Sequence, residues 1–153
     1  TGVQSLSVGW DHTCAALTTG AAKCWGRNSE GQVGDGTYTN RSAPVSVVGL
    51  TSGITAIEAT QSLVTCALVA DSSVKCWGYN AWGQLGDGTT KNRDRPVAVS
   101  GDGNANVELA LGSLFSCSLA SNAAIRCWGL NDHGQLGNGT TNKRDTAGYV
   151  IFD

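Results

Sequence analysis

Residues 24–37 read CWGRNSEGQVGDGT, and the same pattern returns twice further along the chain. Residues 76–89 read CWGYNAWGQLGDGT, and residues 127–140 read CWGLNDHGQLGNGT. The copies begin 52 and 51 residues apart. A period near 50 residues predicts a repeat architecture, in which each copy forms one supersecondary unit. We therefore divide the chain into repeat 1 (residues 1–50), repeat 2 (51–103) and repeat 3 (104–153).

Each repeat holds two cysteines ten residues apart. Between Cys14 and Cys24 the segment 18–20 reads TTG, which suits a three-residue hairpin loop closed by a left-handed glycine. This register places Cys14 opposite Cys24, close to disulfide reach. The alternatives are free thiols or metal ligands, although zinc-binding cysteines are usually about two to four residues apart. The predicted disulfides are Cys14–Cys24, Cys66–Cys76 and Cys117–Cys127.

Short apolar stretches predict four antiparallel strands in every repeat, so the predicted fold class is all-β. In repeat 1 the strands are expected at 3–8, 13–17, 21–25 and 44–47. The last one begins with Pro44, which is tolerated at a strand start because no ladder donor is needed there. The matching strands are 96–99 in repeat 2 and 148–152 in repeat 3, where the proline is lost. A glycine-rich turn precedes each of them, with turn dipeptides at Asp35-Gly36, Asp87-Gly88 and Asn138-Gly139.

These motifs resemble the regulator of chromosome condensation repeat family, whose pattern includes G-x-x-H-[ST]-x-A-L and W-G-x-N-x-x-G-Q-L-G-x-G. Repeat 1 carries the pattern best, whereas Val64 and Phe115 stand where repeat 1 has His12. The resemblance covers essentially the whole chain. It implies β-propeller blades, each a four-stranded sheet, in propellers that usually have seven blades. The cysteine pairs look like those of a secreted or cell-surface bacterial branch of the family.

Three blades do not close a ring, because propellers have roughly four to eight blades. Three arrangements therefore stay open. The chain is a fragment of a longer propeller, or half of a homodimer that closes a six-bladed ring, or an open stack of blades. Disulfides favour an oxidising compartment, so we expect a secreted or cell-surface protein.

Charge and motifs exclude several function classes. The net charge is −2 and the lysines and arginines are scattered, which gives no support for nucleic-acid binding. No apolar run approaches the ~20 residues that a spanning helix needs, so no membrane insertion is expected. The neighbours Asp11-His12 and Asp132-His133 come without a catalytic motif. We expect no enzyme activity, no metal and no cofactor.

Residues that are equal in all repeats indicate structure, and residues that differ indicate function on loops. The tryptophans at the shared position are expected to pack in the core between adjacent blades. Exposed tryptophan and tyrosine are enriched where proteins bind their partners. The predicted core tryptophans are Trp25, Trp77 and Trp128. The candidate contact residues are Trp10, Tyr38, Tyr79, Trp82 and His133.

The sequence thus predicts a non-enzymatic extracellular scaffold that presents variable loops to a protein or glycan. A structural or assembly module of a surface protein is the first alternative. Inhibition of a secreted enzyme is another, because one secreted bacterial relative in the resembling family inhibits β-lactamases. Guanine-nucleotide exchange, as in the member that gives the family its name, is disfavoured by the cysteine pairs and by the lack of a basic tail.

Overall fold

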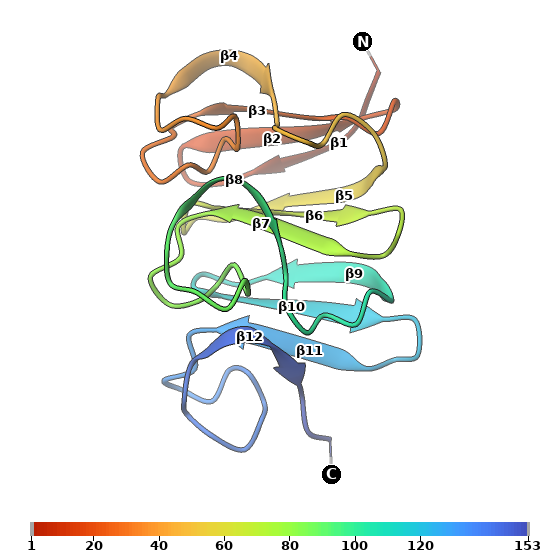
Figure 1. Cartoon of the computed structure of the whole chain (residues 1–153), viewed down its shortest axis with the longest axis vertical. Helices are drawn as coiled ribbons and strands as arrows, with labels where there is room; N and C mark the ends of the chain where they lie inside the picture. The colour runs from red at the N-terminus through yellow and green to blue at the C-terminus, as the bar shows by residue number, and fades with distance from the viewer. Residues whose placement is uncertain (1, 153) are drawn as a thin grey trace.

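The computed structural model describes residues 2–152 as three four-stranded antiparallel sheets, stacked one on another along the long axis (Figure 1). Blade 1 contains β1 (Val3–Val8), β2 (His12–Leu17), β3 (Ala22–Gly26) and β4 (Arg41–Ser46). Blade 2 contains β5 (Ile54–Ala59), β6 (Val64–Val69), β7 (Val74–Gly78) and β8 (Arg93–Ala98). Blade 3 contains β9 (Asn106–Leu111), β10 (Phe115–Ala120), β11 (Ile125–Gly129) and β12 (Arg144–Tyr149).

The strands of each blade are paired in chain order, so every blade is a meander. Strand β5 contacts both β1 and β9, which places the first strands of the three blades along one side of the stack. Strands β4, β8 and β12 form the outer edge of each sheet (Figure 1). The predicted all-β class with three four-stranded repeats is confirmed. Among residues 2–152 there is no helix with the length and apolarity that a membrane span requires.

The predicted bounds of the fourth strands were wrong. Strands β4, β8 and β12 begin three or four residues earlier, at arginines, and β12 ends at Tyr149 instead of continuing to residue 152. Pro44 therefore lies inside its strand rather than at its start. It is tolerated there because β4 is an edge strand and its pairing with β3 shifts register between Cys24 and Gly26.

All three predicted disulfides are present and no cysteine is free. Each joins directly opposed residues of the central hairpin, with Cα atoms 4.1 Å apart. The hairpin register that predicted these pairs is confirmed in blade 1, where Thr13 also pairs with Trp25. Because each bond closes a ten-residue separation within one blade, the bridges tie hairpins and do not link blades.

The hydrophobic core lies between blades rather than within them. One apolar cluster joins Val33 and Val47 of blade 1 to Ile54, Ile57 and other residues of blade 2. A second cluster repeats this arrangement between blades 2 and 3, and includes Leu85 and Leu109. A single blade therefore has no closed core of its own, as expected for a repeat protein stabilised by interfaces between neighbours.

A tryptophan from the following blade closes each of these clusters. Trp77 and Trp128 are fully buried, and their indole nitrogens donate to the carbonyls of Gln32 and Gln84 in the preceding blade, at 3.0 and 2.9 Å. A Cβ atom on Gly34 would lie only 2.6 Å from Nε1 of Trp77, so this position requires glycine. Trp25 is only half-buried, because no preceding blade covers it within residues 2–152.

In each blade the hairpin turn before the third strand (β3, β7 or β11) contains one residue in the left-handed conformation, and this residue is glycine only in blade 1. Gly20 has φ 79°, whereas Ser72 and Ala123 occupy the equivalent positions with φ 63° and 65°. For a residue with a Cβ atom, this conformation is strained by roughly 1–2 kcal/mol. Blades 2 and 3 therefore carry a local strain that blade 1 avoids.

We expect Ala123→Gly to stabilise the chain. Relief of the strain outweighs the extra entropy that glycine brings to the unfolded state, which leaves a gain of about 1 kcal/mol. Chemical unfolding with the disulfides intact measures it. The matched change Gly20→Ala is expected to destabilise the chain. It places a side chain at φ 79°, and the new Cβ would lie 2.5 Å from the main-chain nitrogen of Gly53. An Ala123→Gly variant of lower stability than the parent contradicts the assignment of strain.

Candidate functional site

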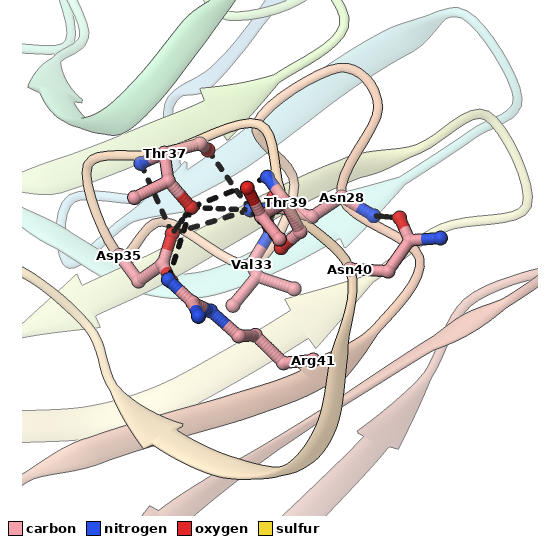
Figure 2. Close-up of polar contacts among 7 residues, drawn as sticks. All are labelled: Asn28, Val33, Asp35, Thr37, Thr39, Asn40 and Arg41. Atoms are coloured by element: carbon pink, nitrogen blue, oxygen red, sulfur yellow. Dashed lines mark hydrogen bonds and ion pairs between the residues drawn. The ribbon is translucent and has the colours of Figure 1, made fainter.

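The long loop between β3 and β4 is held by one asparagine at its centre, which Figure 2 shows for blade 1. The amide oxygen of Asn28 accepts the N–H of Val33 at 2.9 Å. Its amide nitrogen donates to the carbonyls of Thr37 and Thr39 and to Oδ1 of Asp35. Asn28 is fully buried, so the shared asparagine satisfies main-chain groups that the loop would otherwise leave unpaired.

Asp35 extends this network to the start of β4. Its Oδ2 pairs with Nε of Arg41, and its Oδ1 accepts the hydroxyl of Thr37 at 2.7 Å. Partial burial raises the pKa of Asp35, but the hydrogen bonds from Thr37 and Arg41 outweigh it, so the pKa lies below its ordinary value. Arg93 in blade 2 pairs in the same way with Asp87.

These fixed loops and the turns beside them form a shallow groove of about 410 Å³ across the three blades. Its lining combines aromatic and leucine side chains with polar and charged ones. Trp10 is 75% exposed and stands at the β1–β2 turn. The groove is lined by Trp10, Asp11, Arg27, Glu30, Gln61, Ser62, Leu63, Tyr79, Ser113 and Leu114.

Polar contacts hold several of the polar lining residues in place. Arg27 lies 3.5 Å from the carboxylate of Asp11, and both side chains are about half exposed. Glu30 accepts a hydrogen bond from Nδ2 of Asn92 at 2.6 Å, which links the loops of blades 1 and 2. The hydroxyls of Ser62 and Ser113 are 2.9 Å apart and link blades 2 and 3. The groove is therefore a surface of the stack as a whole.

The five candidate contact residues do not form one cluster. Trp10 and Tyr79 line the groove together, although they come from different blades. Tyr38, Trp82 and His133 are exposed on the β3–β4, β7–β8 and β11–β12 loops and do not line it. The residues that sequence reasoning missed are chiefly Glu30, Leu63 and Leu114. They belong to the segments that differ between repeats, but only the stacking of blades shows that they meet.

His12 of the neighbouring residues Asp11-His12 lies in the junction between blades 1 and 2. His12 is 2% exposed, and its Nε2 lies 3.0 Å from the hydroxyl of Thr65 in blade 2. That hydroxyl donates to the carbonyl of Gln32. Burial lowers the pKa of His12 to about 4, against a smaller upward effect of Asp11. The imidazole is a neutral part of the junction between blades, out of reach of a substrate.

Acidification is expected to weaken this junction. Because the pKa of His12 falls from 6.5 when unfolded to about 4 when folded, the unfolded chain takes up the proton first. Stability should therefore decrease as the pH falls from 6.5 to 4, and the contribution of His12 at pH 5 is a loss of roughly 2 kcal/mol. Chemical unfolding at pH 7 and pH 5 measures the loss.

His12→Val, which places the blade 2 residue in blade 1, should remove this part of the pH dependence. His133→Gln, at the exposed histidine, is the matched control and should keep it. Equal pH dependence in the parent and in His12→Val contradicts the burial of a neutral imidazole at the junction.

Comparison with known proteins gives a consistent family match. Two models described as "Regulator of chromosome condensation (RCC1) repeat" match the chain, one at residues 3–32 and 107–135 and the other at 22–67 and 71–119. The human E3 ubiquitin-protein ligase HERC2 is 33% identical over 120 residues, which are 77% of this chain and 2% of HERC2. The Arabidopsis thaliana ultraviolet-B receptor UVR8 is 28% identical over 138 residues, 90% of this chain and 31% of the receptor.

Solved structures agree on the fold. Prp20p from Saccharomyces cerevisiae superposes with a TM-score of 0.85 at 17% identity, over 99% of this chain and 39% of that protein. Human WBSCR16 superposes with a TM-score of 0.80 at 20% identity, over 96% of this chain and 37% of that protein. The chain thus spans less than half of the proteins that it matches.

Proposed function

This chain belongs to the regulator of chromosome condensation (RCC1) repeat family, and we propose that its blades form a recognition module that binds a protein partner through the groove at Trp10 and Tyr79. The observation that carries the proposal is the exposure of Trp10 in a groove lined by both apolar and polar side chains. Apolar anchors within a polar rim are the usual composition of a protein interface. Rigid loops also reduce the entropy lost on binding.

The relatives support this class of function. Prp20p is described as binding Gsp1p and histones, so the same fold presents protein-binding surfaces in another chain. Two other relatives, HERC2 and HERC5, are named as ligases, so the repeat also occurs in proteins described as enzymes. For these blades we propose binding without catalysis. Three disulfides favour an oxidising environment, so we propose an extracellular partner, for which a secreted enzyme is one candidate class.

The test is Trp10→Ala. Affinity capture with the parent chain identifies bound extracellular proteins, and titration calorimetry then compares the variants. A buried anchor typically contributes about 2 kcal/mol or more, so we expect at least a tenfold loss of affinity. The melting temperature should not change, because Trp10 is largely exposed. Tyr38→Ala is the matched control and should bind normally, since Tyr38 is exposed but lies outside the groove.

A different pattern of results distinguishes the alternatives. A partner that binds Trp10→Ala as tightly as the parent contradicts the groove as the site. Sugar-dependent quenching of tryptophan fluorescence that is lost in Trp10→Ala identifies a glycan instead of a protein. Stable ligand-free assemblies that bind nothing favour the structural module.

We also propose that a second copy of the chain is a partner, joined head to tail. Inside the chain, Gly36 and Gly88 donate their N–H groups to the carbonyls of Asp94 and Asp145 in the next blade, each at 2.8 Å. Blade 3 has the same loop with an open space lined by Gly134, Gly139, Thr140, Thr141 and Asn142. The half-buried Trp25 presents the complementary side of blade 1. Two copies joined twice in this way would form a six-bladed ring.

Light scattering over a concentration series tests this contact. We expect a dimer that Thr141→Arg converts to a monomer, because the arginine enters the open space. Thr90→Arg, at the equivalent exposed position of blade 2, should leave the dimer intact. A monomer at all concentrations contradicts the ring, and larger open assemblies show that the contact forms without closure.

A further inference from the structure

Blade 3 has an asparagine where blades 1 and 2 have aspartate. Oδ1 of Asp35 and of Asp87 accepts three hydrogen bonds, from the loop asparagine and from the N–H and hydroxyl of the threonine two residues on. Oδ1 of Asn138 accepts the same three, from Nδ2 of Asn131 at 3.2 Å and from Thr140 at 3.1 and 2.9 Å. The site therefore places an amide in surroundings that elsewhere hold a carboxylate.

The other atom of the side chain makes the difference. Oδ2 of Asp35 and of Asp87 accepts from the arginine that opens the fourth strand, whereas Asn138 has an amide nitrogen in that role, and an amide nitrogen only donates. Arg144 keeps the register of Arg41 and Arg93, opposite the glycine that ends the third strand. Its guanidinium instead lies over Gly148, where a Cβ atom would overlap it.

The residue after Asn138 is glycine, the residue that least hinders attack by its own main-chain nitrogen on the preceding side chain. Gly139 is exposed, and its N–H has no main-chain partner among residues 2–152, in contrast to Gly36 and Gly88. The three donors on Oδ1 of Asn138 are placed to stabilise negative charge on that oxygen during such an attack.

We propose that Asn138 is a self-modification site, at which the folded chain converts the asparagine to aspartate and so forms a third loop ion pair with Arg144. The nitrogen of Gly139 bonds to Cγ of Asn138, and the bond from Cγ to Nδ2 breaks. The Gly139 proton passes through solvent to the departing nitrogen, which leaves as ammonia. Water then adds to the cyclic imide and breaks one of its two C–N bonds. No oxidation or reduction takes place.

The loop geometry that the three repeats share favours one of the two products of imide hydrolysis, aspartate over isoaspartate. Opening of the imide at Cγ restores the normal main chain and yields an aspartate that matches Asp35 and Asp87 in place and in hydrogen bonds. Opening at the main-chain carbonyl of residue 138 gives isoaspartate, which inserts a methylene into the main chain. The extra methylene would move the donors and acceptors of this loop out of register. We therefore expect aspartate to be the main product in the folded chain.

The test is incubation of the purified chain at mildly alkaline pH with the disulfides intact, at a concentration where it is monomeric. Peptide mass spectrometry follows replacement of NH₂ by OH at residue 138, and electron-based fragmentation distinguishes aspartate from isoaspartate. We expect conversion at Asn138 that is faster than at the buried Asn28, Asn80 and Asn131, with aspartate in excess. Absence of conversion, or isoaspartate as the main product, overturns the proposal.

Three substitutions test the chemistry and the outcome. Thr140→Val removes one donor to Oδ1, so conversion should be slower by several-fold; equal or faster conversion shows that the donors do not promote it. Asn138→Asp should melt at a higher temperature than the parent, and Arg144→Gln should abolish that gain. A gain that persists without Arg144, or no gain, contradicts the third ion pair. None of the three changed residues lines the groove at Trp10.

Discussion

Blades 1 and 2 are each completed by the blade that follows, through one main-chain carbonyl that accepts hydrogen bonds from two side chains of that next blade. The carbonyl of Gln32 accepts from Trp77 and Thr65, and that of Gln84 accepts from Trp128 and Ser116. The indole that donates is also the side chain that closes the apolar cluster. Since the bond and the packing come from the same residue, a junction forms as a unit, and the stack is stabilised junction by junction.

This constraint explains which residues are free to vary. The shared glycines, asparagines and glutamines hold the loop that supplies the carbonyl, so a change there disturbs two blades. The turns before β2, β6 and β10 differ in sequence from blade to blade. Trp10, Leu63 and Leu114 occupy these turns and line one groove. The groove proposed for recognition is therefore lined in part by residues of these variable turns.

Most of the fold could be predicted because the three copies of the repeat can be aligned, which shows the positions that they share. Cys14 and Cys24 were placed opposite each other by the hairpin register, and the same register holds in all three blades. The fourth strand could not be delimited from its apolar residues, because its pairing with the third strand is interrupted at Trp25 and resumes at Arg41. An edge strand is paired on one side only, and its alternation of apolar and polar residues is weaker than that of a central strand.

The groove could be predicted only in part, for a geometric reason. Trp10 and Tyr79 were recognised one at a time as variable and aromatic, but their meeting depends on how blade 1 is rotated against blade 2. At the junction of blades 1 and 2 His12 faces Thr65, while the equivalent positions of the next junction hold Val64 and Ser116. The two junctions of one chain thus share hydrogen bonds and differ in what fills the space around them. A repeat protein that keeps the same hydrogen bonds between blades, but varies the side chains packed around them, retains its architecture while its surface diverges.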